Sequence, residues 1–112
     1  MDAKEYLSGI SLINAKLRNK IDELDELSDY PKEVQNALIN EIIALRDERW
    51  RRIQVIEELP LNQYQLMYMK YVRGMSYAEM MEETGRSYTW ATSTHQTALA
   101  KVQKILGGQN DI

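Results

Sequence analysis

The chain has 112 residues, a formal net charge of −3, no Cys and one His, and 44% of its residues are hydrophobic. This length fits one small domain, or one domain with a helical appendage. The absence of Cys excludes a disulfide framework and a thiolate metal site, and one His is too few for a histidine-rich metal site. Residues 1–20 lack a signal-peptide pattern, and no apolar run is long enough to span a membrane. We therefore expect a cytoplasmic protein with no cofactor and no membrane partner.

The charge is unevenly distributed along the chain. Residues 1–59 contain nine Lys or Arg against thirteen Asp or Glu, whereas residues 60–112 contain five against four. Between Gly85 and Leu106 there are three basic residues and no acidic residue. The overall acidity argues against a nucleic-acid coat protein, but it is compatible with a small DNA-reading face at the C-terminal end.

Residues 3–29 have the periodicity of an amphipathic helix. Apolar side chains recur every three or four residues, at Leu7, Ile10, Ile13, Leu17, Ile21, Leu24 and Leu27. Asp2 followed by Glu5 predicts a capping box at the start of this helix. Pro31 ends it, because the residue before a proline avoids the helical conformation.

Residues 32–59 predict a second helix of similar length. Its apolar stripe consists of Val34, Leu38, Ile42, Leu45, Ile53, Ile56 and Leu59. Two helices of about 40 Å each, joined by a short break, predict an antiparallel helical hairpin. Since each helix buries only one stripe, we expect the hairpin to pack on the C-terminal part of the chain or on a second copy, as a homodimer through residues 3–59.

The middle of the second helix is rich in arginine, at Arg46, Arg49, Arg51 and Arg52. Such a cluster is compatible with phosphate binding. The spacing favours a solvated helix face instead, on which Asp47 pairs with Arg51 and Glu48 pairs with Arg52. Trp50 interrupts this polar run, and it is either a core side chain or a contact to a partner.

The third predicted helix follows a boundary at Leu59 and Pro60, and it ends at Arg73 and Gly74, where the glycine marks its C-terminus. Met and Tyr recur in it at helical spacing, which indicates a packed core. Ser76 and Glu79 then form a second capping-box pattern, which predicts a short helix over residues 77–84.

Gly85 and Ser87 predict a tight turn and a further long helix. Glycine supplies the positive φ that a sharp turn needs, and Ser87 caps the helix over residues 87–106. The apolar stripe of that helix is Ala91, Ala98, Val102 and Ile105, with Thr94 and His95 at the missing turn. A short helix, a glycine turn and a capped longer helix form the layout of a helix–turn–helix, whose second helix enters the DNA major groove.

This C-terminal part resembles domain 4 of bacterial sigma factors over about residues 57–106. The resemblance rests on Leu59, Pro60, Gln63, Leu66, Met69, Tyr71, Gly74, Ser76, Tyr77, Glu79, Met80, Gly85, Ser87, Ala98 and Leu99. The segment from Asp2 to Leu7, the long helices after it, and Ser87-Tyr88 ahead of His95 are similar to small sigma-like phage and prophage regulators of the ArpU/RinA type from Gram-positive hosts. That family implies sequence-specific DNA binding and transcription control in a bacterial host cell, with RNA polymerase as a further partner.

These features together predict an all-α fold. A long antiparallel helical hairpin, residues 1–58, serves for packing or dimerisation. It precedes a three-helix, sigma domain 4-like helix–turn–helix domain, residues 59–108, and a tail, residues 109–112.

The residues expected to face double-stranded DNA lie around the turn and on the last helix. They are Arg73, Ser76, Tyr77, Arg86, Ser87, Tyr88, Thr89, Thr92, Ser93, His95, Gln96 and Lys101. Sigma-like relatives usually carry Arg or Lys at several of these positions and at the position of Thr97. Since Lys and Arg contacts to phosphate supply most nonspecific affinity, one copy should bind DNA weakly. Dimerisation or tethering to RNA polymerase would compensate through effective concentration.

Trp90, at the start of the last helix, either contacts DNA or packs on the core, and we favour packing.

Met81 and Ala91 depart from the pattern of the resembled family. The family usually has Ala at the position of Met81 and Val or Ile at that of Ala91, where the two side chains face each other. We therefore expect Met81 and Ala91 to be a compensating pair that conserves volume.

Two other functions are compatible with the sequence. One is an interaction protein that contacts RNA polymerase or another protein without binding DNA. The other is a packaging adaptor like the phage terminase small subunit, which also joins a helix–turn–helix to oligomerising helices. The sequence offers no nucleophile with a neighbouring base and no set of metal ligands, so we do not expect an enzyme.

Overall fold

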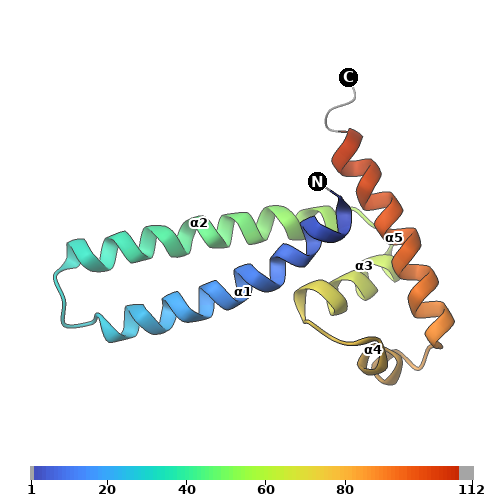
Figure 1. Ribbon diagram of the computed structural model, residues 1–112, viewed down its shortest axis with the longest axis horizontal. Helices are drawn as coiled ribbons and strands as arrows, with labels where there is room; N and C mark the ends of the chain where they lie inside the picture. Colours follow the sequence, from blue (N-terminus) through green and yellow to red (C-terminus); the bar gives the residue numbers. More distant parts are fainter. Residues whose placement is uncertain (1, 109–112) are drawn as a thin grey trace.

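Two long helices make up the first half of the protein. The computed structural model describes residues 2–108, and within them every regular element is helical, which confirms the all-α prediction. Helix α1 spans Ala3–Glu26 and helix α2 spans Lys32–Glu57. The two run antiparallel and side by side, and the turn between them lies at the far end of the molecule (Figure 1).

Polar contacts at both ends of the α1–α2 pair hold the two helices in register. Near the body of the molecule, Arg52 Nη1 donates a hydrogen bond of 2.6 Å to the carbonyl of Tyr6. Towards the free end, Lys20 Nζ lies 2.8 Å from Glu41 Oε2. Each contact joins the beginning of one helix to the end of the other, which requires an antiparallel arrangement.

Both helices end earlier than the sequence pattern predicts. α1 stops at Glu26 and not at residue 29, because the backbone of Leu27, with φ −94° and ψ 13°, leaves the helical conformation. α2 stops at Glu57 and not at residue 59. At the start of α1, the N–H of Glu5 donates to Asp2 Oδ1 at 2.9 Å, which is one of the two hydrogen bonds of the predicted capping box.

The third predicted helix is divided into two parts. Helix α3, Leu61–Met67, continues directly into the π-helical turn η1, Tyr68–Val72. The wider turn is closed by the N–H of Arg73, which donates to the carbonyl of Tyr68 at 3.0 Å, and Gly74 then leaves the helix with φ +70°. The sequence pattern does not predict this π-turn.

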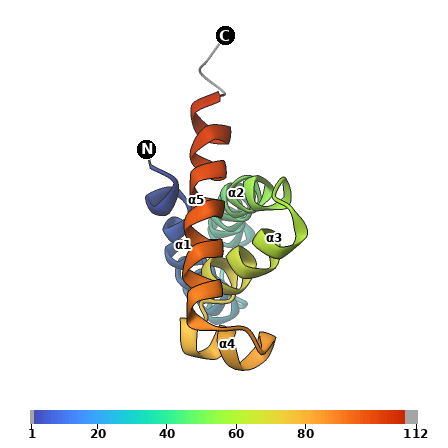
Figure 2. The same cartoon turned by 90° about the vertical axis from the view of Figure 1, so that its right-hand side faces the viewer.

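The last two helices match their predicted starts. Helix α4 spans Tyr77–Thr84, and helix α5 spans Tyr88–Gly108, two residues beyond the predicted end. Figure 2 shows α5 running the height of this end of the molecule, with α4 beside its first turns. The predicted tail, residues 109–112, lies outside the described residues.

One hydrophobic core joins the two halves of the chain. It draws buried residues from α1, α2 and the C-terminal helices: Ala3, Leu7, Ile10, Ile53, Val55, Ile56, Leu59, Leu66, Met67, Met69, Tyr71, Met80, Ala91, Ala98 and Val102. The N–H of Ala3 also donates to Gln103 Oε1 at 2.8 Å, which ties the start of α1 to α5.

The rest of the α1–α2 pair projects away from this core. The radius of gyration is 17.2 Å, against about 13 Å for a compact chain of this length. The difference reflects the free end of the pair, which extends beyond the C-terminal helices in Figure 1.

Candidate nucleic-acid interface

The turn between α4 and α5 is held by side-chain caps on both helices. Ser76 and Glu79 form a full capping box at the start of α4: the N–H of Glu79 donates to Ser76 Oγ at 3.2 Å, and the N–H of Ser76 donates to Glu79 Oε1 at 3.1 Å. Gly85 ends α4 in the left-handed conformation, with φ +68°. The N–H of Trp90 then donates to Ser87 Oγ at 3.0 Å, which caps the start of α5. The chain therefore turns sharply and presents the first turns of α5 at the surface.

His95 lies in the interior, where two tyrosines hold its ring. Its Nε2 lies 2.6 Å from the hydroxyl of Tyr71, and its Nδ1 lies 2.7 Å from the hydroxyl of Tyr77. A neutral imidazole donates through one nitrogen and accepts at the other, so one tyrosine donates to the ring and the other accepts from it. Only 7% of His95 is exposed. This burial removes His95 from the candidate DNA contacts, which corrects the prediction from sequence.

Burial also sets the protonation of this cluster. Desolvation lowers the pKa of His95 to about 4, with a smaller contribution to this value from the nearby charges of Lys70 and Lys4. Desolvation raises the pKa of Tyr71 to about 12. All three rings are therefore neutral near pH 7. Tyr77 is half-buried, since its hydroxyl lies against His95, and its ring packs edge-on against the exposed ring of Tyr88.

The two candidate arginines beside the turn differ in their surroundings. Arg73 makes a bidentate ion pair with Glu83, with N–O distances of 3.0 and 3.2 Å, so a carboxylate already compensates its charge. The guanidinium of Arg86 lies over the ring of Trp90, 5.1 Å from its centroid, and Arg86 remains exposed. Of the two, Arg86 is the better placed to meet a phosphate.

The remaining candidates lie at the start of α4, on the first turns of α5 and, in the case of Lys101, in the second half of α5. Those that the structure leaves exposed are Ser76, Ser87, Tyr88, Thr89, Ser93, Gln96 and Lys101. Thr92 is half-buried, and its hydroxyl donates to the carbonyls of Tyr88 and Thr89, at 3.1 and 3.2 Å. A hydroxyl that already donates to the backbone has no proton for a phosphate oxygen, so Thr92 is a weaker candidate.

The packing of the motif differs in one respect from expectation. Met80 is the fully buried methionine of α4, and it belongs to the same core cluster as Ala91. Met81 is only half-buried and does not belong to that cluster. The structure therefore does not support a compensating pair of Met81 and Ala91. Trp90 is half-buried and packs against the core, in agreement with the favoured interpretation.

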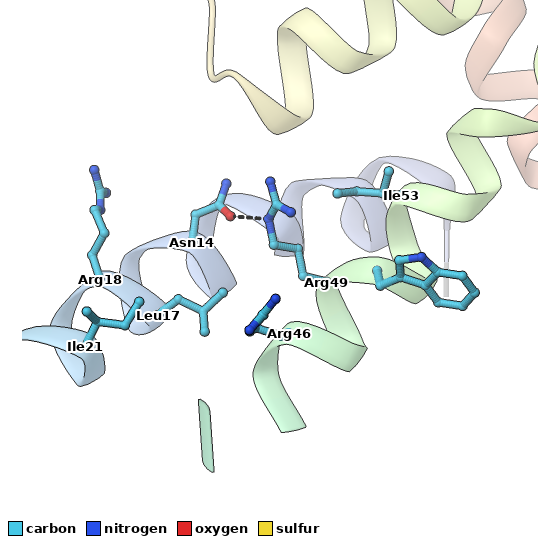
Figure 3. Close-up of a pocket in the computed structure, with 8 residues that line it drawn as sticks. Asn14, Leu17, Arg18, Ile21, Arg46, Arg49 and Ile53 are labelled. Carbon is cyan, nitrogen blue, oxygen red and sulfur yellow. Dashed lines mark hydrogen bonds between the residues drawn. The ribbon is translucent and has the colours of Figure 1, made fainter. Parts of the chain in front are cut away.

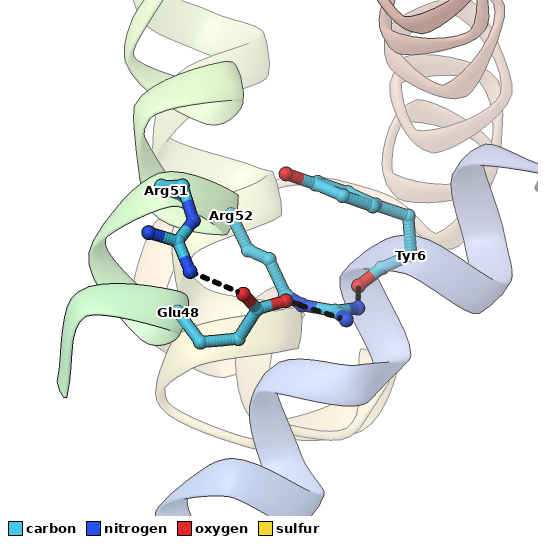
Figure 4. A network of polar contacts seen from close by, with 4 residues as sticks. All are labelled: Tyr6, Glu48, Arg51 and Arg52. Atoms are coloured by element: carbon cyan, nitrogen blue, oxygen red, sulfur yellow. Dashed lines mark hydrogen bonds and ion pairs between the residues drawn. The ribbon is translucent and has the colours of Figure 1, made fainter. Parts of the chain in front are cut away.

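The arginine-rich part of α2 forms a polar network with α1 (Figure 4). Glu48 accepts from Arg51 Nη2 at 2.7 Å and lies 2.9 Å from Arg52 Nη2, and these hydrogen bonds lower its pKa. The predicted pair of Glu48 and Arg52 is confirmed. The predicted pair of Asp47 and Arg51 is wrong, because Arg51 turns to Glu48 three residues earlier. Trp50 is 62% exposed, so it is not a core side chain.

No protein family model, curated protein or solved structure matches this chain. Within residues 2–108, no group of three or more His, Cys, Asp or Glu side chains is arranged to hold a metal ion. In the same part of the chain, no helix combines the length and the apolar character needed to cross a membrane. The geometry of the surface is therefore the basis for a functional proposal.

Sequence reasoning did not find the cluster of His95, Tyr71 and Tyr77. A signal for His95 was present in the spacing, because the histidine occupies the gap between Ala91 and Ala98 in the apolar stripe of α5. Such a position faces the core. Nothing in the sequence identifies the two tyrosines as its partners, since they come from η1 and α4.

Proposed function

We propose that the protein is a sequence-specific DNA-binding transcription regulator of the phage type. In this proposal, helices α3 to α5 form a sigma domain 4-like unit, and α5 enters the major groove with its N-terminal residues first. The α1–α2 pair is the hairpin that supports this unit. The observation that supports the proposal best is the capped turn at Gly85, which joins a short helix to a long helix with exposed polar side chains on its first turns.

Three exposed side chains of α5 are candidates to read bases. Thr89, Ser93 and Gln96 are spaced four and three residues apart, so they lie on one face of the helix. A Gln amide can bind an adenine edge through two hydrogen bonds, and hydroxyls can contact a base or a phosphate. Gln96 therefore carries most of the base specificity in this proposal.

Few basic residues remain to bind phosphates. Arg86 and Lys101 are exposed, whereas Arg73 is paired with Glu83 and His95 is buried and neutral. Two phosphate contacts per copy correspond to a slope of about −2 in a plot of log affinity against log salt concentration. We expect weak binding with this shallow salt dependence.

Fluorescence anisotropy on a set of upstream phage DNA fragments, at two or more salt concentrations, tests the proposal. Lys101→Ala should weaken binding to all fragments and reduce the slope by about 1. Gln96→Ala should cost about 1–3 kcal/mol on the preferred fragment only. As a control, Lys32→Ala with Asn40→Ala removes one charge and one amide from exposed positions of α2 and should leave binding unchanged.

The nearly neutral surface at the start of α5 supports a second candidate, an interaction protein that binds RNA polymerase or another protein. If no fragment binds at about 50 mM salt, where phosphate contacts are strongest, and RNA polymerase co-purifies with the protein, this second candidate replaces the first. Ring-like higher oligomers would instead indicate a packaging adaptor.

A further inference from the structure

The α1–α2 pair has an apolar surface that the described chain does not cover. Within residues 2–108, six of the eight exposed large hydrophobic residues lie on this pair or its connecting turn: Leu12, Ile21, Tyr30, Val34, Ile43 and Trp50. Leu12 comes nine residues before Ile21, so it lies on the opposite side of α1. The buried residues of α1 all lie between Ala3 and Ile13, so its second half has none. α2 buries Leu38 and Ile42 in the free half of the pair, but α1 contributes no buried side chain there.

A groove of about 570 Å³ crosses this surface (Figure 3). α1 contributes Leu17 and Ile21 to its wall, and α2 contributes Trp50 and Ile53. A smaller hollow shares Arg46 and Trp50 with the groove and adds Ile43 and the carboxylate of Asp47 to its lining. The apolar side chains make the surface suited to a protein partner, because the phosphates of a nucleic acid would leave them exposed to water.

The groove is also basic. Arg18, Arg46 and Arg49 line it, and within residues 2–108 none of the three forms a salt bridge with a carboxylate. Arg49 Nε donates to Asn14 Oδ1 at 2.7 Å, which fixes this guanidinium beside α1 (Figure 3). A partner for this groove should therefore carry both apolar and acidic side chains.

The end of α1 next to the groove has that composition. Exposed carboxylates follow one another at Asp22, Glu23, Asp25 and Glu26, and within the described chain none of them forms a salt bridge. Asp22 and Asp25 lie four and seven residues after Arg18, so they continue the helix face that lines the groove. One face of the pair thus carries two charged segments side by side along the helices. The basic segment contains Arg18, Arg46 and Arg49, and the acidic segment contains Asp22 and Asp25.

We propose that a second copy of this chain docks on this face, in an antiparallel twofold dimer of α1–α2 pairs. In such a dimer, the groove of each copy binds the acidic segment of the other, so both contacts form at once. Arg18 and Asp25 are about 10 Å apart along the helix, which places the twofold axis midway, near Ile21. The apolar residues Ile21 and Ile43 then meet at the centre, with charged contacts on both sides.

The free end limits the area of this dimer. Because α1 ends at Glu26, only five residues beyond Ile21, the two pairs overlap over about 20 Å. With a width of about 20 Å this offers about 400 Å² per copy, half of a standard protein–protein interface, so we expect a weak dimer. The dimer goes beyond the proposed DNA binding and does not depend on it, because it is measured without DNA.

Charge reversal in two variants tests the proposal by sedimentation equilibrium of the full chain. Arg18→Glu with Arg46→Glu reverses two of the three arginines of the basic segment, and Asp22→Lys with Asp25→Lys reverses two carboxylates of the acidic segment. Each variant alone should dimerise at least about tenfold more weakly than the wild type. An equimolar mixture should recover the wild-type association, because both contacts between unlike copies then join opposite charges. Circular dichroism should show wild-type helicity for both variants.

Cysteine variants test the position of the twofold axis. Because the wild-type chain has no Cys, any disulfide must involve the introduced residue. Ile21→Cys should form a disulfide-linked dimer under mild oxidation, whereas Leu12→Cys, equally exposed but far from the axis, should not. A monomeric wild type would overturn the proposal, as would a mixture of charge variants that associates no better than its components. If the wild type is monomeric and Arg18→Glu with Arg46→Glu abolishes DNA binding, the groove binds phosphates instead.

Discussion

The buried histidine should make the stability of the protein depend on pH. The pKa of His95 is about 4 in the folded protein, against about 6.5 in an unfolded chain. The unfolded state therefore binds more protons than the folded state when the pH falls below about 6.5. The stability associated with this group is complete above that pH, and it is lost progressively as the pH falls towards 4.

The two pKa values set the size of this effect. At pH 5 the imidazole is mostly protonated in the unfolded chain, whereas it is mostly neutral in the folded protein. With about 1.4 kcal/mol per pKa unit, the free energy of unfolding should be about 2 kcal/mol smaller at pH 5 than at pH 7 because of His95 alone. This is a large share of the stability of a small domain.

Urea unfolding followed by circular dichroism, at pH 5, 6 and 7, measures the effect. His95→Gln is the matched control, since it keeps a polar side chain for Tyr71 and Tyr77 but does not titrate in this range. The loss of stability in the wild type should exceed that in the variant by about 2 kcal/mol.

NMR measures the same quantity directly, because the chain has only one His and its ring signals need no assignment. An imidazole pKa near 6.5 in the folded protein would refute the reasoning. An equal pH dependence in the wild type and in His95→Gln would refute it as well.

Two further predictions concern the turn and the core of the C-terminal helices. Gly85→Ala should destabilise the protein by about 1–2 kcal/mol in a urea melt, because alanine is strained at φ +68° although nothing lies within 4 Å of its added methyl group. Gly107→Ala, at an equally open position without a positive φ, should cost nothing, and an equal loss in both variants would contradict this account. Met80→Ala should cost about 2–5 kcal/mol because its side chain is fully buried. Met81→Ala should cost less than about 1 kcal/mol, and the reverse order would show that the packing of α4 is misassigned.

The sequence alone predicts a helix end correctly where that end is determined by residues a few positions away. The start and end of α4 were predicted correctly because Ser76, Glu79 and Gly85 act within a few residues of each other. The start of α5 followed in the same way from Ser87. These caps are determined by hydrogen bonds between adjacent residues, so no knowledge of the fold is needed to find them.

The features that the sequence did not predict depend on contacts between segments that are far apart in the chain. Tyr71 and Tyr77 come from separate elements, so their convergence on His95 depends on how α5 packs. Similarly, the carbonyl of Val72, in the π-turn, accepts from Asn14 Nδ2 of α1 at 3.4 Å. A hydrophobic pattern reports which face of a helix is buried, but it does not report which partners meet there.

The shared core has a consequence for how this protein can be divided. Ala3, Leu7 and Ile10 of α1 pack in the same cluster as Met80 and Val102 of the C-terminal helices. A fragment that begins after α2 would expose apolar side chains that α1 covers in the whole chain. The α1–α2 pair is therefore not an exchangeable module. Recombination that replaced it would have to preserve a matched set of buried side chains at the junction with α5, so the two halves are expected to evolve together.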